Sequence, residues 1–227
     1  MVEEEFGPDS PEVVRLLWAL LSANNKLGNF EVVIELASRL LLLKTETKEK
    51  TAADCLVLLG STYGKIGWYD NAILTLKAAG LSADSDYVLG QSLRIVAAMY
   101  GCLRMFEDAA ATAERAFNIG VQALDYENRI SHQGACVLVL MEVYQMAGMQ
   151  SKYEALKHAH GLSSLRDPLP PILNMYPKAC ASCRSLASSK NLQKCGKCQS
   201  IWYCSKECQK NDWKRHKEFC KMLSKTV

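Results

Sequence analysis

The stretch CASCRSLASSKNLQKCGKCQSIWYCSKECQKNDWKRHKEFC, residues 180–220, decides how the C-terminal part of this 227-residue chain folds. It contains seven cysteines and one histidine in a regular series: Cys180, Cys183, Cys195, Cys198, Cys204, Cys208, His216 and Cys220. Structural zinc takes four thiolate or imidazole ligands, so eight ligands make two closed sites with none left over. Two cysteines separated by two residues (C-x2-C) can both lie in one tight turn. The pairs Cys204/Cys208 and His216/Cys220 are each four residues apart, so the two members of a pair lie on the same face of a helix. The series therefore predicts a module that binds two zinc ions.

The spacing does not decide which four ligands share an ion. A sequential arrangement, with the first four ligands on one ion and the last four on the other, fits as well as an interleaved one. A disulfide framework is a further alternative, but a histidine in register has no role in such a framework. Because all ligand positions are supplied by the protein, the sites have no place for water or substrate, which indicates structural rather than catalytic zinc.

The segment Tyr203-Cys204-Ser205-Lys206-Glu207-Cys208-Gln209, followed by Trp213, His216 and Cys220, resembles the MYND zinc finger. The resemblance implies a cross-braced arrangement, with Cys180, Cys183, Cys204 and Cys208 on one ion and Cys195, Cys198, His216 and Cys220 on the other. It also implies that residues 180–220, called the finger below, bind proline-rich segments with an embedded leucine along a hairpin strand at 199–203. The peptide-binding residues would be Gln199, Ser200, Ile201, Trp202, Gln209 and Trp213. Trp213 would serve equally well in the finger's own core.

Residues 11–160 are typical of successive helices, and their pattern repeats. The repeat is anchored at Asn24, Tyr63, Tyr100 and Tyr144. Four residues after the anchors come Gly28, Gly67, Arg104 and Gly148, and nine residues after them come Val33, Ala72, Ala109 and Tyr153. A glycine that ends one helix, followed by apolar or small residues at helical spacing, indicates a tightly packed helix hairpin.

This pattern resembles the tetratricopeptide repeat (TPR) of the kinesin-light-chain type, whose period exceeds the usual 34 residues. The resemblance implies a superhelix whose first helices line a concave face, which we expect to include Gly64 and Arg94. We expect three repeats and a fourth helical pair that caps the array. The predicted fold class is an all-α, TPR-like superhelix followed by a small cross-braced zinc module.

The predicted organisation is a helical array at 1–160, a proline-rich linker at 161–179, the finger at 180–220 and a tail at 221–227. The linker contains four prolines, Pro168, Pro170, Pro171 and Pro177, which favour extended polyproline geometry. Its segment 167–173 itself combines prolines with leucine, so it would bind the chain's own finger, bind the finger of a neighbouring molecule and promote self-association, or serve as a stiff spacer. We favour the spacer.

Charge is divided unevenly along the chain, whose net charge is +3. Residues 176–227 carry 12 Lys and Arg against 3 Asp and Glu, whereas residues 1–175 carry 15 against 21. No apolar run approaches the roughly 20 residues of a membrane helix, and the acidic N-terminus lacks the features of a signal peptide. We expect an intracellular protein, cytoplasmic or nuclear, with reduced cysteines available to metal.

These features predict a zinc-binding adaptor for protein–protein interaction, with a proline-rich partner on the finger. The array would be a scaffold or a second peptide-binding surface for another protein partner, and both interpretations stay open. The alternative is a basic, nucleic-acid-associated transcriptional regulator, although nucleic acid is the less favoured partner because the finger has few arginines. No catalytic arrangement is found, so no enzyme activity is expected. Cys55, Cys102, Cys136 and His132 are interpreted as packing or surface residues, with His132 between helices.

Overall fold

The computed structural model describes residues 7, 9–43, 48–83, 85–123, 126–162, 176, 178–183, 191–199 and 201–223. For residues 48–51, 123, 126–129, 218, 219, 222 and 223, it describes the backbone only. Residues 167–173, the linker segment with prolines and leucine, lie outside the described residues, as does Ser200 of the expected peptide-binding set. Among the described residues, no helix is long and apolar enough to cross a membrane.

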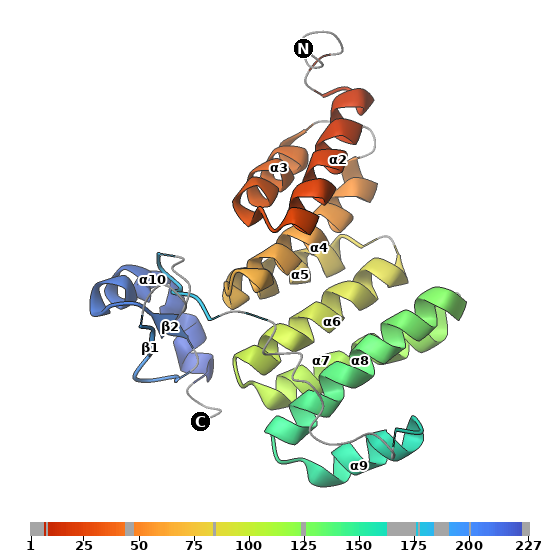
Figure 1. Cartoon of the computed structure of the whole chain (residues 1–227), viewed down its shortest axis with the longest axis vertical. Coiled ribbons are helices and arrows are strands. Elements are labelled where there is room, and N and C mark those ends of the chain that lie inside the picture. The colour runs from red at the N-terminus through yellow and green to blue at the C-terminus, as the bar shows by residue number, and fades with distance from the viewer. Residues whose placement is uncertain are drawn as a thin grey trace.

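Eight helices form four consecutive hairpins that stack in chain order (Figure 1). The pairs are α2 (Pro11–Leu27) with α3 (Phe30–Leu42), α4 (Lys48–Lys65) with α5 (Tyr69–Leu81), α6 (Asp86–Cys102) with α7 (Phe106–Ala123), and α8 (Tyr126–Met146) with α9 (Gln150–Ala159). Each helix of the array packs against the next one in the chain. Short local helices that contact their sequence neighbours are the arrangement of a helical repeat array, as the sequence predicts.

One turn is repeated at the centre of all four hairpins. The backbone carbonyls of the four anchors accept hydrogen bonds from the N–H groups five residues later: Asn24 from Asn29, Tyr63 from Trp68, Tyr100 from Met105 and Tyr144 from Met149, at 2.8–3.0 Å. The residue between them has a left-handed backbone, with φ of 77° at Gly28, 80° at Gly67, 64° at Arg104 and 69° at Gly148. This is the Schellman motif that ends a helix. The fourth pair therefore turns in the same way as the other three.

Arg104 occupies the left-handed position without being a glycine. Such a conformation costs roughly 1–3 kcal/mol for a residue with a side chain, and the surrounding structure must compensate for it. The Arg104 guanidinium lies over the Phe106 ring, 6.0 Å from its centroid, so the side chain packs on the first residue of the next helix.

The residues nine after the anchors are fully buried, with Val33, Ala72 and Ala109 at 0% exposure and Tyr153 at 2%.

In its described residues, the finger contains a two-stranded antiparallel sheet and one helix. Strand β1 (Gln193–Lys194) pairs with β2 (Trp202–Tyr203), and α10 (Lys206–Leu223) follows. The strand is shorter than the expected 199–203, because Gln199 adopts a positive φ of 55° and belongs to the turn around Cys195 and Cys198. The helix α10 also continues to Leu223, into the segment expected to be a tail.

His132 lies inside α8 and is buried, so the expected position between helices is wrong. Its ring fills the space that two glycines leave: a Cβ added at Gly90 would lie 3.1 Å from the ring and one at Gly120 only 2.5 Å from it. The Nε2 atom lies 2.9 Å from the Ala116 carbonyl of α7. His132 is thus a packing residue, and burial lowers its pKa, which keeps the ring neutral.

The close approach of α4 and α5 predicts a cost for a methyl group at Gly60. A Cβ there would lie 2.5 Å from Leu76 Cγ and 3.3 Å from the Ala72 carbonyl oxygen. We expect Gly60→Ala to lower the free energy of unfolding by roughly 1–3 kcal/mol, because overpacking outweighs the higher helix propensity of alanine. Gly134→Ala is the control, since nothing lies within 4 Å of its Cβ. Chemical denaturation should show Gly134→Ala unchanged or stabilised, and equal effects at both sites would contradict this packing.

Candidate metal centre

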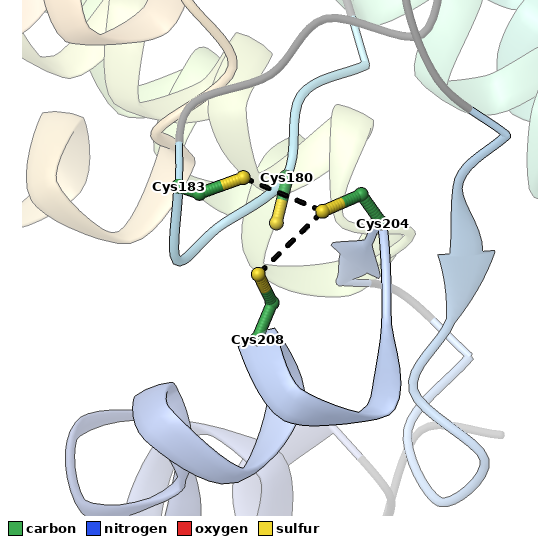
Figure 2. Close-up of side chains that lie close together, drawn as sticks. All are labelled: Cys180, Cys183, Cys204 and Cys208. Carbon is green, nitrogen blue, oxygen red and sulfur yellow. Dashed lines mark hydrogen bonds between the residues drawn. The ribbon is translucent and has the colours of Figure 1, made fainter.

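Four cysteine sulfurs from three segments converge at the first candidate zinc site (Figure 2). Cys180 and Cys183 come from the loop that opens the finger, Cys204 follows β2, and Cys208 lies in the first turn of α10. The Sγ atoms of Cys183 and Cys204 are 3.4 Å apart, and those of Cys204 and Cys208 are 3.5 Å apart. A tetrahedron with Zn–S bonds of about 2.3 Å has S–S edges of about 3.8 Å, so the four sulfurs lie close to zinc geometry.

The second candidate site combines three cysteines with a histidine, and all four are buried. Cys195 and Cys198 come from the turn between the strands, whereas His216 and Cys220 lie one turn apart on α10. The sulfurs of Cys195 and Cys220 are 3.8 Å apart, and Cys198 Sγ lies 3.6 Å from His216 Nε2. In each site, all ligand atoms lie within 4.8 Å of one another.

The grouping is interleaved, so the structure has the cross-braced arrangement and the sequential alternative is wrong. None of the described cysteines is joined to another in a disulfide bond. The sulfur separations of 3.4–3.8 Å also exceed the disulfide bond length of about 2.05 Å. Three or four sulfurs at tetrahedral spacing are the donor set that zinc prefers. The finger therefore has two zinc sites, each with four protein ligands.

Local interactions place the ligands of both sites. Ser205 precedes α10, and its Oγ accepts a hydrogen bond of 3.1 Å from the Cys208 N–H, which starts the helix where Cys204 and Cys208 face one another. The Tyr203 hydroxyl donates a 2.7 Å hydrogen bond to Asp212, which fixes β2 against α10. The Tyr203 ring also packs edge-on against His216, with centroids 5.9 Å apart.

The electrostatics of the ligands suit a cation. Hydrogen bonding with Cys183 and Cys208 raises the pKa of Cys204 to about 12, because these bonds favour the protonated form of its thiol over a thiolate. A divalent ion removes this penalty by neutralising the thiolates. Burial, assisted by the charge of Arg215, lowers the pKa of His216 to about 4, so its imidazole is neutral as a zinc ligand must be.

The three cysteines outside the finger have different surroundings. Burial is the main cause that raises the pKa values of Cys55, Cys102 and Cys136 to about 12. Protonated thiols inside a helical array act as small apolar side chains. Their positions agree with the packing role that the sequence predicts.

The expected peptide-binding residues lie in several environments. Gln199 is exposed in the turn, whereas Ile201 is 6% exposed and belongs to the core. Trp202 is half-buried, with the ammonium groups of Lys178 and Lys194 5.0 and 5.1 Å from its ring centroid.

The two expected peptide-binding residues on α10 are both coupled to the second zinc site. The Gln209 side chain donates to Cys195 Sγ at 3.5 Å. Trp213 is 41% exposed, and its ring meets His216 edge-on with centroids 6.1 Å apart. The residue thus combines an exposed side with a contact to a zinc ligand.

Arg215 joins the finger to the helical array, a role that sequence reasoning missed. Its guanidinium donates to Asp70 and to Asn71 Oδ1 in the first turn of α5, the latter at 2.8 Å. It also donates to Asp212 Oδ1 at 2.7 Å and to the Ala181 carbonyl at 3.1 Å. A cavity of about 350 Å³ beside this contact is lined by Trp68, Asn71, Ala181, Ser182, Asn211, Asp212 and Arg215.

Tyr176, from the linker, lies against residues of the array face that we expected to be concave. The Tyr69 hydroxyl donates to the Tyr176 carbonyl at 3.2 Å, and a Cβ at Gly64 would lie 3.5 Å from the Tyr176 ring. Burial raises the pKa of Tyr176, while the nearby Arg94 opposes that shift. The chain's own tyrosine thus covers part of the surface around Gly64 and Arg94.

The zinc sites predict how the chain responds to metal removal. A segment of about 41 residues buries too little apolar surface to fold alone, so zinc binding supplies its folding free energy. We expect native mass spectrometry of the reduced chain to show two zinc ions. Chelation should abolish the finger's structure and leave the array helical by circular dichroism. One ion or none in the reduced chain, or parallel loss of array helicity, would contradict this.

The Arg215 contact predicts that docking can be weakened without loss of metal. Arg215→Ala leaves the carboxylates of Asp70 and Asp212 without their cation. We expect this substitution to weaken the contact between the finger and the array by about 1–3 kcal/mol. The loss should lie toward the lower end of that range, because the Arg215 side chain is 41% exposed. Hydrogen exchange should become faster in the first turn of α5 while two zinc ions stay bound. Lys214→Ala, an exposed neighbour, is the control and should leave exchange unchanged.

Comparison with known proteins agrees with this geometry. Residues 180–220 match the family model of the MYND finger. The chain is 37% identical over 62 residues to histone-lysine N-methyltransferase ASHR1 of Arabidopsis thaliana, which is 24% of this chain and 13% of that protein. It is 39% identical over 51 residues to Egl nine homolog 1 of Mus musculus, covering 22% and 13% of the two chains. SET domain-containing protein 14 of Caenorhabditis elegans is 48% identical over 44 residues, covering 19% and 10%.

The matches therefore span 13% or less of the length of these relatives. They concern a stretch about the size of the finger and carry no whole-protein activity to this chain. Together, the family match and the two ligand groups show that residues 180–220 are a MYND zinc finger, which follows a helical region.

Proposed function

We propose that this protein is an adaptor whose MYND finger binds a proline-rich segment of a partner protein. The observation that carries the proposal is Trp213, a large aromatic residue that stays 41% exposed on a helix fixed by two zinc sites. An exposed indole on a rigid element is a typical anchor of peptide recognition. The proline-rich segment loses little entropy on binding because it is already extended.

The rigidity of this surface comes from the second zinc site. Trp213 packs on the ligand His216, and Gln209 donates to the ligand Cys195. The indole therefore presents one side to the finger and the other to a partner. Trp213 can therefore contribute to the core of the finger and to peptide binding at the same time.

The hairpin offers one edge for an added strand. On one side of β2, the Ala181 N–H donates to the Trp202 carbonyl at 2.9 Å, and on the other side β2 pairs with β1. Among the described residues, no strand pairs with the outer edge of β1. We place the extended peptide along Gln193 and Lys194 of β1 rather than along the expected strand at 199–203.

The helical array is proposed as the scaffold that orients the finger. Arg215 of the finger and Tyr176 of the linker both form hydrogen bonds with residues in the first turn of α5. These contacts hold the finger at a defined place on the array. Tyr176 covers part of the face that a second peptide would need. Because both zinc sites have complete protein ligation, we propose a binding role and no catalysis. Reduced thiolate ligands suit a cytoplasmic or nuclear setting.

The proposal predicts that Trp213→Ala weakens peptide binding while the metal stays. We expect at least about a tenfold loss of affinity for a synthetic peptide with prolines around one leucine, because a hot-spot aromatic contributes about 2 kcal/mol or more. Titration calorimetry measures the affinity, and native mass spectrometry counts zinc.

Tyr87→Ala is the matched control, since Tyr87 is 42% exposed on the array and should not affect binding. Release of zinc by Trp213→Ala would make the residue structural and refute its binding role. Unchanged peptide affinity with two zinc ions bound would refute the proposed site. Gln209→Ala is a weaker test, because it removes a hydrogen bond to a zinc ligand.

A further inference from the structure

Five lysines lie on one face of α10, at positions 206, 210, 214, 217 and 221. With 3.6 residues per turn, they fall within a sector of about 80° around the helix. All five side chains are exposed. The row spans about 22 Å along the helix, at a rise of 1.5 Å per residue. We call these five residues the lysine stripe.

The lysine stripe points away from the helical array. Arg215, which contacts α5, lies roughly 140° around the helix from the centre of the stripe. The zinc ligands Cys208, His216 and Cys220 also lie outside the sector of the stripe. The acidic first 175 residues therefore do not neutralise these lysines through the docking contact.

Within α10 itself, three acidic residues accompany the five lysines of the stripe. Glu207 and Glu218 occupy helix positions about 20° and 40° beyond Lys214, outside one edge of the stripe. Asp212 is turned toward Arg215 and Tyr203. In the described part of the chain, no ion pair involves Lys206, Lys210, Lys214 or Lys217. Lysines this close together repel one another, so the face gains free energy when carboxylates or other anions approach it.

Trp213 and Gln209 border the stripe. On the helix, Trp213 lies about 20° from Lys206 and about 40° from Lys217, so indole and lysines form one continuous surface. The geometry points to the lysine stripe as the docking surface for acidic residues that flank the proline-rich segment of the partner, an inference that rests on the proposed function. The proline–leucine core binds at Trp213 and the β1 edge, and the acidic flank extends over α10.

A protein flank fits this surface better than a nucleic acid does. The described face contains lysines and no arginine, because Arg215 is turned to the array. Single-stranded nucleic acid is held by several aromatic rings on which successive bases stack, whereas Trp213 is the one exposed aromatic residue described on α10. Lysines as point charges attract carboxylates without requiring a planar fork.

The experiment uses the full zinc-loaded chain and three synthetic peptides with the same proline–leucine core. One peptide has neutral flanks, one has four glutamates before the core, and one has four glutamates after it. We expect one acidic peptide to bind about tenfold more tightly than the neutral peptide at low salt, with the advantage disappearing at high salt. Lys210→Glu/Lys214→Glu should abolish that advantage and leave the affinity for the neutral peptide unchanged.

Lys26→Glu/Arg115→Glu is the matched control, because it changes the net charge equally at exposed positions of the array. It should keep the advantage of the acidic peptide. Equal binding of all three peptides would refute the inference that the lysine stripe binds an acidic flank, and it would leave the proposed function standing. Failure of all three peptides overturns both. Tight binding of an oligothymidylate that depends on the stripe, with no gain for acidic peptides, assigns the surface to nucleic acid and overturns the inference. If the charge-reversed variant does not fold, Lys210→Gln/Lys214→Gln is the second variant, and it should reduce the advantage of the acidic peptide in the same salt series.

Discussion

The convergence of eight ligand atoms into two tetrahedral groups is the constraint on which the C-terminal module depends. Four thiols within 4.8 Å of one another cannot all ionise without a cation, and the raised pKa of Cys204 expresses that conflict. A metal ion resolves it and at the same time joins the loop at Cys180, the strand β2 and the helix α10. Elements of only two residues, such as β1 and β2, are otherwise too short to be stable. The zinc sites therefore determine where Trp213 lies.

The same constraint reaches the helical array through one side chain. Arg215 lies next to the ligand His216 and is oriented by Asp212, which in turn accepts a hydrogen bond from Tyr203 of β2. Its guanidinium then contacts Asp70 at the start of α5. A continuous hydrophobic core also extends from the second repeat into the finger. Metal binding thus fixes both the shape of the finger and the position of that finger on the array.

Sequence reasoning was most successful where the physical signal is local. The eight ligands follow from spacing alone, and the four anchors of the repeat coincide with four Schellman turns, because both patterns arise from residues a few positions apart. Arg104 shows the limit of that approach, since a glycine pattern does not identify a non-glycine in the left-handed region. Arg215 and Tyr176 contact residues more than 100 positions away, and no periodicity signals such contacts. The sequence indicated that His132 lies between helices because its neighbours along the chain are polar, whereas α8 continues through that segment.

The two sides of α10 explain why a basic module is attached to an acidic helical array without being neutralised by it. One cation, Arg215, is used for docking and is shielded by two carboxylates, Asp70 and Asp212. The lysines occupy the opposite side and stay exposed. Had the helix been rotated by half a turn, the lysines would have met the array and the indole of Trp213 would have been covered. The orientation that Arg215 fixes is therefore the one that leaves the aromatic and basic surface of the finger accessible to a partner.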